Sequence, residues 1–403
     1  MSTVGPGIDD SIGRATDPGS PAADTASDTA SDTAAATVAG GAAARLAGGQ
    51  PQMVTRARRV LNPSGEEPYL VVKDLRVEFP TPDGPVKAVQ GLSYALPLGR
   101  TLAIVGESGS GKSVSSMAVM GLHDARRTAI SGSIMLGGQE IVGLSAAEMR
   151  KQRGQVASMI FQDPQSSLHP YFKIGWQIVE AYRAHHNVSR QVARKRALEM
   201  LDLVGIPNPQ RRIDQFPFEF SGGMRQRAMI AMALVNDPKL VIADEPTTAL
   251  DVTVQAQILD LLNNLQKEFG SAIVLITHDL GVVAEVADDV LVMYAGRCVE
   301  YGTAHEVLAE PTHPYTWGLL QSIPTVSGEQ SRLLPIAGNP PSLVNLPSGC
   351  SFHPRCPYRA RVPADRCRTE LPELVRKTAG TDASRCHLDN PVHIYETEVE
   401  PSL

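Results

Sequence analysis

The chain has 403 residues, enough for two domains or for one large domain with appendages. Its 37 Lys and Arg residues against 43 Asp and Glu residues give a formal net charge of -6, which disfavours generic nucleic-acid binding because no basic excess exists to neutralise phosphates. It has no uncharged apolar run of the ~18 residues that span a bilayer, and its five cysteines are too few for a disulfide framework in so long a chain.

Residues 1–65 consist mainly of Ala, Thr, Asp, Ser, Gly and Pro, and residues 24–34 form a near repeat, DTASDTASDTA. Such a segment has too few large apolar side chains to offset the entropy of ordering, so we expect a disordered, low-complexity extension. The amino terminus lacks a basic stretch followed by an apolar core, so nothing in it is typical of a secretory signal. We therefore expect a cytosolic protein.

Strand-like and helix-like segments alternate along the next part of the chain. Apolar residues keep helical spacing twice, from Ala193 to Val204 and from Val254 to Phe269. Short runs rich in Val, Leu and Ile are typical of strands, and they cover residues 69–79, 102–105, 240–244, 272–277 and 290–296. This alternation predicts an α/β fold. From Pro311 onward the sequence is rich in Pro and Cys with little periodicity, which predicts a boundary there.

A phosphate-binding loop is the most specific local motif. The sequence GESGSGKS, residues 106–113, follows a predicted strand and precedes a predicted helix. Glycines let backbone N–H groups close around phosphate oxygens, Lys112 neutralises the β- and γ-phosphates, and the Ser113 hydroxyl ligates Mg²⁺. The residues expected to bind ATP here are Gly106, Ser108, Gly109, Ser110, Gly111, Lys112 and Ser113.

Two later strands end in candidate catalytic residues. The strand LVIAD is followed by Glu245, so Asp244 is expected to hold the Mg²⁺ shell and Glu245 to activate the attacking water. His278 follows the next apolar strand, where its imidazole would contact the γ-phosphate. A lone histidine is usually structural, and its position after this strand is what makes it a candidate.

Residues 220–234, FSGGMRQRAMIAMAL, contain a second candidate anion site. Ser221 is placed to cap a helix, and Gly222 and Gly223 would expose backbone N–H groups at its amino end. Together with the phosphate-binding loop, this segment resembles the ABC ATPase family, whose signature begins Leu-Ser-Gly-Gly. The sequence departs from the family in Phe220 and in Met224, where Gln is commonest, but it keeps the three phosphate-facing residues.

The resemblance implies further roles. It predicts a P-loop NTPase core at residues 66–310 with an α-helical subdomain at about residues 166–237. Gln162 corresponds to a loop residue that contacts Mg²⁺ and the membrane subunit, and Asp251 to a loop that signals across the dimer. Phe79 stands where the family has an aromatic ring that stacks on adenine, usually Tyr. ATP in this family lies between two subunits placed head to tail, so a second ATPase is required.

The carboxy-terminal region, residues 311–403, indicates the kind of transporter. HPYT (residues 313–316), the Pro-rich LPIAGNPPSL and GCSFHPRCPY resemble the appendage of dipeptide and oligopeptide importer ATPases. The resemblance implies a peripheral protein at the cytoplasmic face of the membrane with two permease subunits, an extracytoplasmic peptide-binding protein and a second ATPase that forms a heterodimer. Alternatives are an ATPase for nickel, haem or another small solute, a soluble ABC ATPase acting on DNA or ribosomes, and a metal-sensing regulator.

Four cysteines lie near the carboxyl terminus, at positions 350, 356, 367 and 386, with 5, 10 and 18 residues between them. The absence of a C-x-x-C pair weakens a zinc interpretation. Related peptide-importer ATPases carry a [4Fe–4S] cluster in this region, so the resemblance favours Cys350, Cys356, Cys367 and Cys386 as its ligands; zinc or free thiols remain alternatives. Cys298 is expected to be a small buried hydrophobe and His313 a turn residue before Pro314.

Overall fold

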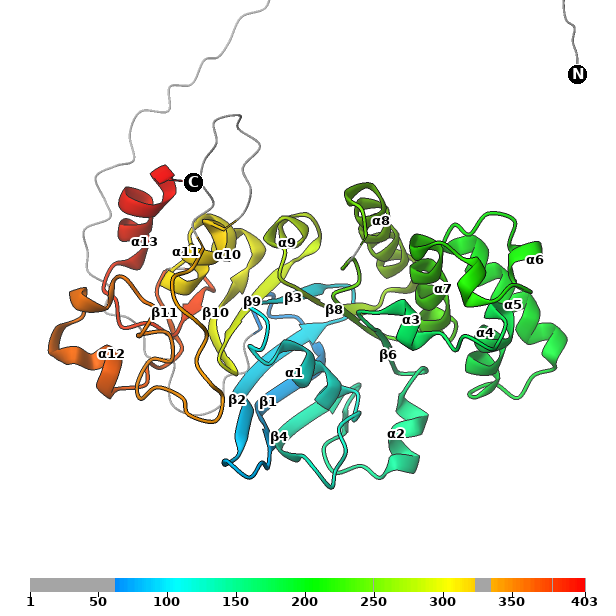
Figure 1. The fold of residues 1–403 in the computed structure, drawn as a ribbon, viewed down its shortest axis with the longest axis horizontal. Helices are drawn as coiled ribbons and strands as arrows, with labels where there is room; N and C mark the ends of the chain where they lie inside the picture. The colour runs from blue at the N-terminus through cyan, green and yellow to red at the C-terminus, as the bar shows by residue number, and fades with distance from the viewer. Residues whose placement is uncertain (1–61, 249, 323–334, 379, 403) are drawn as a thin grey trace, which may run out of the picture. The chain divides into compact units, whose positions relative to one another are not determined.

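A computed structural model of the chain describes residues 62–248, 250–322, 335–378 and 380–402 (Figure 1). They belong to one compact unit, Gln50–Leu403. The predicted disordered extension, residues 1–65, lies outside the described residues except for 62–65. No helix in these described ranges combines the length and the apolar character that crossing a bilayer requires.

A mixed sheet organises the fold. Among the described residues it has eight strands in the order β11-β12-β10-β9-β3-β8-β7-β6. The run β9-β3-β8-β7-β6 is parallel, and every residue of β3, β7, β8 and β9 is buried, as expected for strands covered on both faces. The strands are β3 (Thr101–Val105), β6 (Ala157–Ile160), β7 (Leu240–Asp244), β8 (Ala272–Thr277), β9 (Asp289–Tyr294), β10 (Arg297–Thr303), β11 (Val375–Arg376) and β12 (Ala383–Ser384).

A second, antiparallel sheet lies against the first. In the described part of the chain its order is β2-β1-β4-β5. Its apolar face shares one core with Leu102 and Ile104 of β3 and with Val119 of α1. The strands are β1 (Pro68–Phe79), β2 (Val86–Pro97), β4 (Ala129–Leu136) and β5 (Gln139–Glu140).

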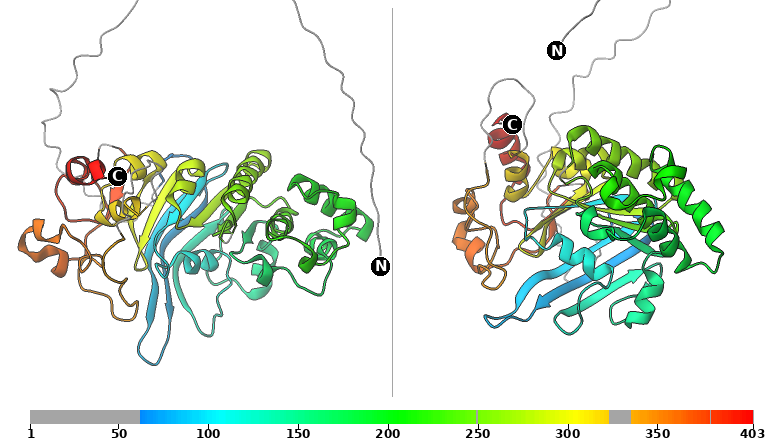
Figure 2. Two further views of the ribbon diagram at one scale, coloured as in Figure 1. Left: turned by 45° about the horizontal axis from the view of Figure 1, so that its top comes forward. Right: turned by 45° about the vertical axis from the view of Figure 1, so that its right-hand side comes forward.

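Helices gather at the β6 end of the large sheet (Figures 1 and 2). Within α5 the buried residues are Ala193, Ala197, Met200 and Leu201, the face that the helical spacing predicted. These helices fall in the region where the sequence predicts a helical subdomain. The helices up to this point are α1 (Lys112–Val119), α2 (Ala146–Gln152), α3 (Pro164–Ser167), α4 (Ile174–Arg183), α5 (Arg190–Leu203), α6 (Pro209–Arg212) and α7 (Gly222–Leu234).

The remaining helices follow the parallel strands or belong to the carboxy-terminal region. They are α8 (Val252–Phe269), α9 (Leu280–Val286), α10 (Ala304–Ala309), α11 (Pro314–Leu320), α12 (Arg366–Thr369) and α13 (Pro391–Ile394). Short 3-10 helices span Pro217–Glu219, Arg359–Arg361, Pro363–Asp365 and Glu400–Ser402, and a π-helix spans Tyr395–Val399.

The carboxy-terminal region is built onto the same sheet. Strand β12 pairs antiparallel with β10, with Ser384 opposite Glu300 and Ala383 opposite Tyr301. Next to this pairing, the buried Thr312 hydroxyl lies within hydrogen-bond distance of both the Glu300 carboxylate, at 2.7 Å, and the Asp382 carboxylate, at 2.8 Å. Residues far apart in the chain are thus joined in one buried polar contact.

Candidate nucleotide-binding site

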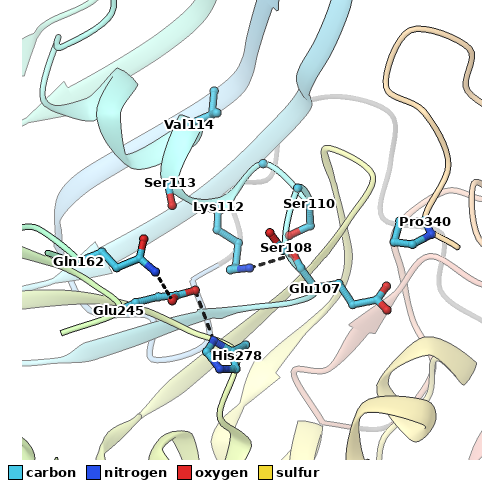
Figure 3. A pocket seen from close by; sticks show the side chains of 12 residues that line it. Glu107, Ser108, Ser110, Lys112, Ser113, Val114, Gln162, Glu245, His278 and Pro340 are labelled. Carbon is cyan, nitrogen blue, oxygen red and sulfur yellow. Dashed lines mark hydrogen bonds and ion pairs between the residues drawn. The ribbon is translucent and has the colours of Figure 1, made fainter. Parts of the chain in front are cut away.

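The predicted catalytic residues meet at one edge of the large sheet. Strands β3, β8, β7 and β6 are parallel neighbours, so their carboxyl ends lie side by side. The phosphate-binding loop follows β3, His278 follows β8, Glu245 follows β7 and Gln162 follows β6. His278, Glu245, Gln162 and the loop from Glu107 onward line one pocket (Figure 3), whereas Gly106 and Asp244 are not among the described residues that line it. The lining consists of Glu107, Ser108, Gly109, Ser110, Gly111, Lys112, Ser113, Val114, Gln162, Glu245, His278 and Pro340.

The backbone of the loop has a shape that two glycines make possible. Gly106 has φ +149° and Gly111 has φ +102°. A Cβ added to Gly106 would lie 2.2 Å from the carbonyl oxygen of Met293, and one added to Gly111 would lie 2.3 Å from the carbonyl oxygen of Ala88. Any larger residue would therefore have to push the loop away from the neighbouring strands, and the loop would lose the close fit that presents its N–H groups.

Lys112 is a buried cation whose hydrogen-bond partners are carbonyl groups of the same loop. Its side chain is largely buried, and Nζ donates to the carbonyl oxygens of Gly106 at 2.6 Å and Glu107 at 3.0 Å. Burial lowers the pKa of Lys112, while the nearby carboxylates of Glu245 and Asp244 act in the opposite direction. An ammonium group that is buried in this way is suited to a strongly anionic ligand, such as a triphosphate.

Of the three predicted Mg²⁺ ligands, Ser113 and Gln162 line the pocket, and Asp244 is bonded to Ser113. The Ser113 hydroxyl donates to Asp244 Oδ1 at 3.0 Å, and Gln162 lines the pocket from the end of β6. Asp244 is buried, which raises its pKa, and the bond from Ser113 counteracts that effect. Hydroxyl, carboxylate and amide oxygens are hard donors, so the chemistry of this set fits Mg²⁺.

Glu245 is held by three side chains. Its Oε2 accepts from Gln162 Nε2 at 2.8 Å and from the Thr248 hydroxyl at 2.9 Å, and its Oε1 lies 3.3 Å from His278 Nδ1 (Figure 3). The backbone of Glu245 has φ +45°, a left-handed conformation that costs energy in a residue other than glycine. Strain of this kind is common where a side chain must be aimed, and here it places a carboxylate beside the phosphate-binding loop.

The signature residues lie outside this pocket. Ser221 caps α7 as predicted, because its hydroxyl accepts from the N–H of Met224 at 3.3 Å. Asp251 caps α8 in the same way through the N–H of Val254 at 3.0 Å. Ser221, Gly222, Gly223 and Asp251 are not among the described residues that line the pocket. The predicted anion site at the start of α7 is therefore no part of this pocket.

Phe79 also lies outside the residues that line the pocket. It ends β1 and is partly buried against the core between the two sheets. Its ring meets the ring of His123 edge-on, with centroids 5.6 Å apart. The adenine-stacking role of Phe79 thus remains a prediction from the family resemblance.

Three residues that line the pocket were missed by the sequence reasoning: Glu107, Val114 and Pro340. The Glu107 carboxylate pairs with Arg355, at 2.6 and 3.0 Å, across 248 positions of sequence. Its backbone N–H donates to the Tyr315 hydroxyl at 2.7 Å. Tyr315 lies in the HPYT motif, which marks its segment in the sequence, whereas no local pattern links Arg355 to the loop.

The four carboxy-terminal cysteines line one small cavity, which lies beside α11 and α12. Burial raises the pKa of Cys350 to about 11 and that of Cys356 and Cys386 to about 12, and it also raises the pKa of Cys367. However, within the described ranges no group of three or more His, Cys, Asp or Glu side chains is placed to hold a metal ion. The side-chain positions therefore do not support the predicted iron–sulfur cluster.

Two simpler expectations concern Cys298 and His313. Cys298 is buried as expected, with its pKa raised to about 12 by burial, so it is a small hydrophobe in the core. His313, expected to be a turn residue, is instead the buried N-cap of α11, where its Nδ1 accepts from the N–H of Tyr315 at 3.1 Å. Burial lowers the pKa of His313 to about 3, so its ring is neutral at physiological pH.

Comparisons with known proteins point in the same direction as the geometry. Residues 89–248 match the family model "ABC transporter", and residues 299–362 match "Oligopeptide/dipeptide transporter, C-terminal region". The chain is 55% identical over 276 residues to the oligopeptide transport ATP-binding protein OppD of Haemophilus influenzae, covering 68% of this chain and 85% of that protein. It is 48% identical over 303 residues to the dipeptide transport ATP-binding protein DppD of Escherichia coli, covering 75% of this chain and 91% of that protein.

A solved structure supports the fold. The dimeric structure of a post-hydrolysis state of the ATP-binding cassette MJ0796, bound to ADP and Pi, superposes with a TM-score of 0.53 at 26% sequence identity. The match covers 58% of this chain and 98% of that one. The core of the described chain thus has the ABC ATPase α/β fold.

Proposed function

The chain belongs to the ATP-binding subunits of the oligopeptide and dipeptide ABC transporter family, and we propose that it hydrolyses ATP to drive peptide uptake through such an importer. The observation that carries the proposal is the pocket where Lys112, Glu245 and His278 meet the phosphate-binding loop. The match of residues 299–362 to the peptide-transporter region assigns the cargo class. We place the nucleotide-binding domain at residues 66–310 and the carboxy-terminal region at 311–403.

The residues of the pocket divide the chemistry between them. Lys112 and the N–H groups of the loop bind the phosphates and stabilise the charge that develops on them. Glu245 accepts the proton of the attacking water, while Gln162 and His278 hold its carboxylate in place. Ser113, Asp244 and Gln162 would hold Mg²⁺, which supplies further charge neutralisation when bound. His278 is 64% exposed at its side chain, so its ring is accessible to a γ-phosphate.

A second ATPase completes the site in this proposal. Ser221, Gly222 and Gly223, the predicted anion site, lie at the start of α7 and do not line the chain's own pocket, which supports a head-to-tail pairing. We propose a heterodimer with a related ATPase. Native mass spectrometry of the purified complex is expected to show one copy of this chain and one copy of its relative. Two copies of this chain with no relative would refute the heterodimer.

The other partners follow from the family. We propose that the ATPase pair binds two membrane-spanning permease subunits at the cytoplasmic face of the membrane, and that an extracytoplasmic binding protein delivers the peptide. Closure of the ATPase pair on ATP and reopening after hydrolysis would drive the permeases between their two states. A peptide importer needs no nucleic-acid partner, in agreement with the net charge of -6.

The test is uptake of labelled di- and oligopeptides into membrane vesicles that contain the permeases, the second ATPase and the binding protein. We expect uptake that depends on ATP and is lost in the Glu245→Gln variant. ATP hydrolysis without uptake of any peptide would refute the cargo and direct the search to nickel, haem or other small solutes. Absence of ATP binding would refute the site itself.

We also propose that Cys350, Cys356, Cys367 and Cys386 hold a [4Fe–4S] cluster. The support is the family resemblance together with the four thiols themselves, because thiolates are the donors that such a cluster requires. The thiols line one cavity, although in the described part of the chain they are not placed to hold a metal ion. When bound, the cluster would cross-link these segments. The protein purified without oxygen is expected to contain about four iron atoms per chain. The proposal would be refuted if the protein contained no metal and unfolded at the same temperature whether or not iron was supplied. One zinc ion per chain would replace the cluster by a zinc site.

A further inference from the structure

The phosphate-binding loop carries a negative charge at Glu107. Glu107 is the second residue of the loop, and its carboxylate lies close enough to act on the charge of Lys112. It lines the pocket that the phosphates of ATP are proposed to enter. A free carboxylate at this place would repel a triphosphate and would compete for the cation that binds it.

The carboxy-terminal region holds this carboxylate. Arg355 Nη1 donates to Glu107 Oε2 at 2.6 Å and Arg355 Nη2 to Glu107 Oε1 at 3.0 Å, a two-pronged ion pair. The Arg355 side chain is 5% exposed and that of Glu107 is 27% exposed. Because the arginine is almost completely withdrawn from water, the pair is screened much less than a surface ion pair.

Arg355 is itself fixed by its neighbours. Its Nε donates to the carbonyl oxygen of Ala337 at 3.0 Å, and Nη2 donates to that of Ile336 at 3.1 Å. Its guanidinium also lies over the rings of Tyr294 and Phe352, 5.8 and 6.0 Å from their centroids. The arginine therefore has one defined position, from which it draws the Glu107 carboxylate to its side of the pocket.

The same loop residue has a second bond to the carboxy-terminal region. The N–H of Glu107 donates to the hydroxyl of Tyr315, a residue of the HPYT motif that is fully buried. Figure 3 shows the Glu107 side chain directed away from Lys112 and toward the segment that carries Pro340. Both the backbone and the side chain of Glu107 are thus held by residues that lie beyond position 311.

We propose that Arg355 is a positioning residue for nucleotide binding, which neutralises Glu107 and keeps its carboxylate away from the phosphates of ATP. Tyr315 supports it by fixing the backbone at the same place. The carboxy-terminal region then sets the affinity of the loop for ATP. This inference rests on the proposed ATP site and adds a role for residues outside it.

The test compares ATP affinity among variants of the full chain, with a fluorescent ATP analogue as the probe. We expect Arg355→Ala to raise the dissociation constant by about tenfold or more, since loss of one partner leaves a charge poorly compensated. Arg355→Lys keeps the charge without the two-pronged geometry, so its dissociation constant should lie between those of the parent and of Arg355→Ala. The double variant Arg355→Ala/Glu107→Gln should recover most of the affinity, because the repelling carboxylate is gone.

Recovery of ATP affinity in the double variant distinguishes an electrostatic role of Arg355 from a purely structural one. If Arg355→Ala binds ATP as the parent does, or if the double variant binds as weakly as Arg355→Ala, the proposal is overturned. Thermal unfolding of each variant shows whether the chain is folded, and Arg355→Gln replaces Arg355→Ala if the latter is not. Lys112→Ala serves as the reference: unchanged binding in that variant would overturn the ATP site, which is a different failure.

Discussion

Replacement of Glu245 by Gln separates catalysis from binding in this pocket. The amide has nearly the shape of the carboxylate but cannot accept a proton from water. Its single carbonyl oxygen can keep the bonds from Gln162 and Thr248, while its NH₂ group meets His278. The loss is at most one hydrogen bond, the one with His278, which is worth about 0.5–1.5 kcal/mol. Removal of a general base costs about 100-fold to 10,000-fold in rate, or about 2.7–5.5 kcal/mol in activation free energy.

Because the rise in activation free energy exceeds the free energy of the lost hydrogen bond, Glu245→Gln is predicted to impair ATP turnover far more than ATP binding. In the assembled complex, ATP turnover is expected to fall by about 100-fold or more, while the dissociation constant for ATP changes by less than about tenfold. The assay is phosphate release at saturating ATP, together with binding of a fluorescent analogue. Thr248→Ala is the matched control, because it removes one bond to the carboxylate and leaves the base in place. Turnover within about threefold of the parent for Glu245→Gln would show that another group accepts the proton.

Three further predictions concern the loop and the buried carboxyl pair. Lys112→Ala should weaken ATP binding by about 10-fold to 100-fold, as measured by titration, because one or two charge-assisted hydrogen bonds to the phosphates are lost. If the variant and the parent bound ATP equally well, the phosphate-binding role of the loop would be refuted. Gly111→Ala should lower the unfolding temperature more than Gly109→Ala, because only at Gly111 would the new Cβ collide with a backbone oxygen, 2.3 Å away on Ala88. Burial raises the pKa of Asp382, so the folded chain binds more protons than the unfolded one and stability is lost as pH rises. Asp382→Asn should therefore gain stability relative to the parent as the pH rises from about 4 to about 8 in urea unfolding, and a difference that does not change with pH would refute this sign.

The parts of the site that could be predicted are those written in short, contiguous stretches. The loop from Gly106 to Ser113 and the pair Asp244 and Glu245 each follow an apolar run, and the rule that parallel strands end at one edge brings them together. The capping role of Ser221 also depends on neighbours in sequence alone. Such features need no knowledge of the rest of the fold.

Contacts between distant residues were not predictable in the same way. The pairing of Glu107 with Arg355 depends on how a region with little periodicity folds back onto β3 and β9, and neither residue lies in a pattern that marks a partner. The pairing of β12 with β10 was missed for a similar reason, since two-residue strands leave no alternation to detect. Phe79 was assigned by analogy with a family position, and the structure gives it a neighbour, His123, that the analogy did not include.

The attachment of the carboxy-terminal region to the large sheet bears on how that region can be studied. A chain cut at the predicted boundary before Pro311 would lose β12, and the backbone of β10 at Glu300 and Tyr301 would then be an open edge. Unpaired edges of this kind recruit strands from other copies and lead to aggregation. The cut would also strip the buried Glu300 carboxylate of its bond to Thr312. Truncation would therefore produce insoluble protein for reasons unrelated to ATP, whereas single substitutions in this region leave the edge covered.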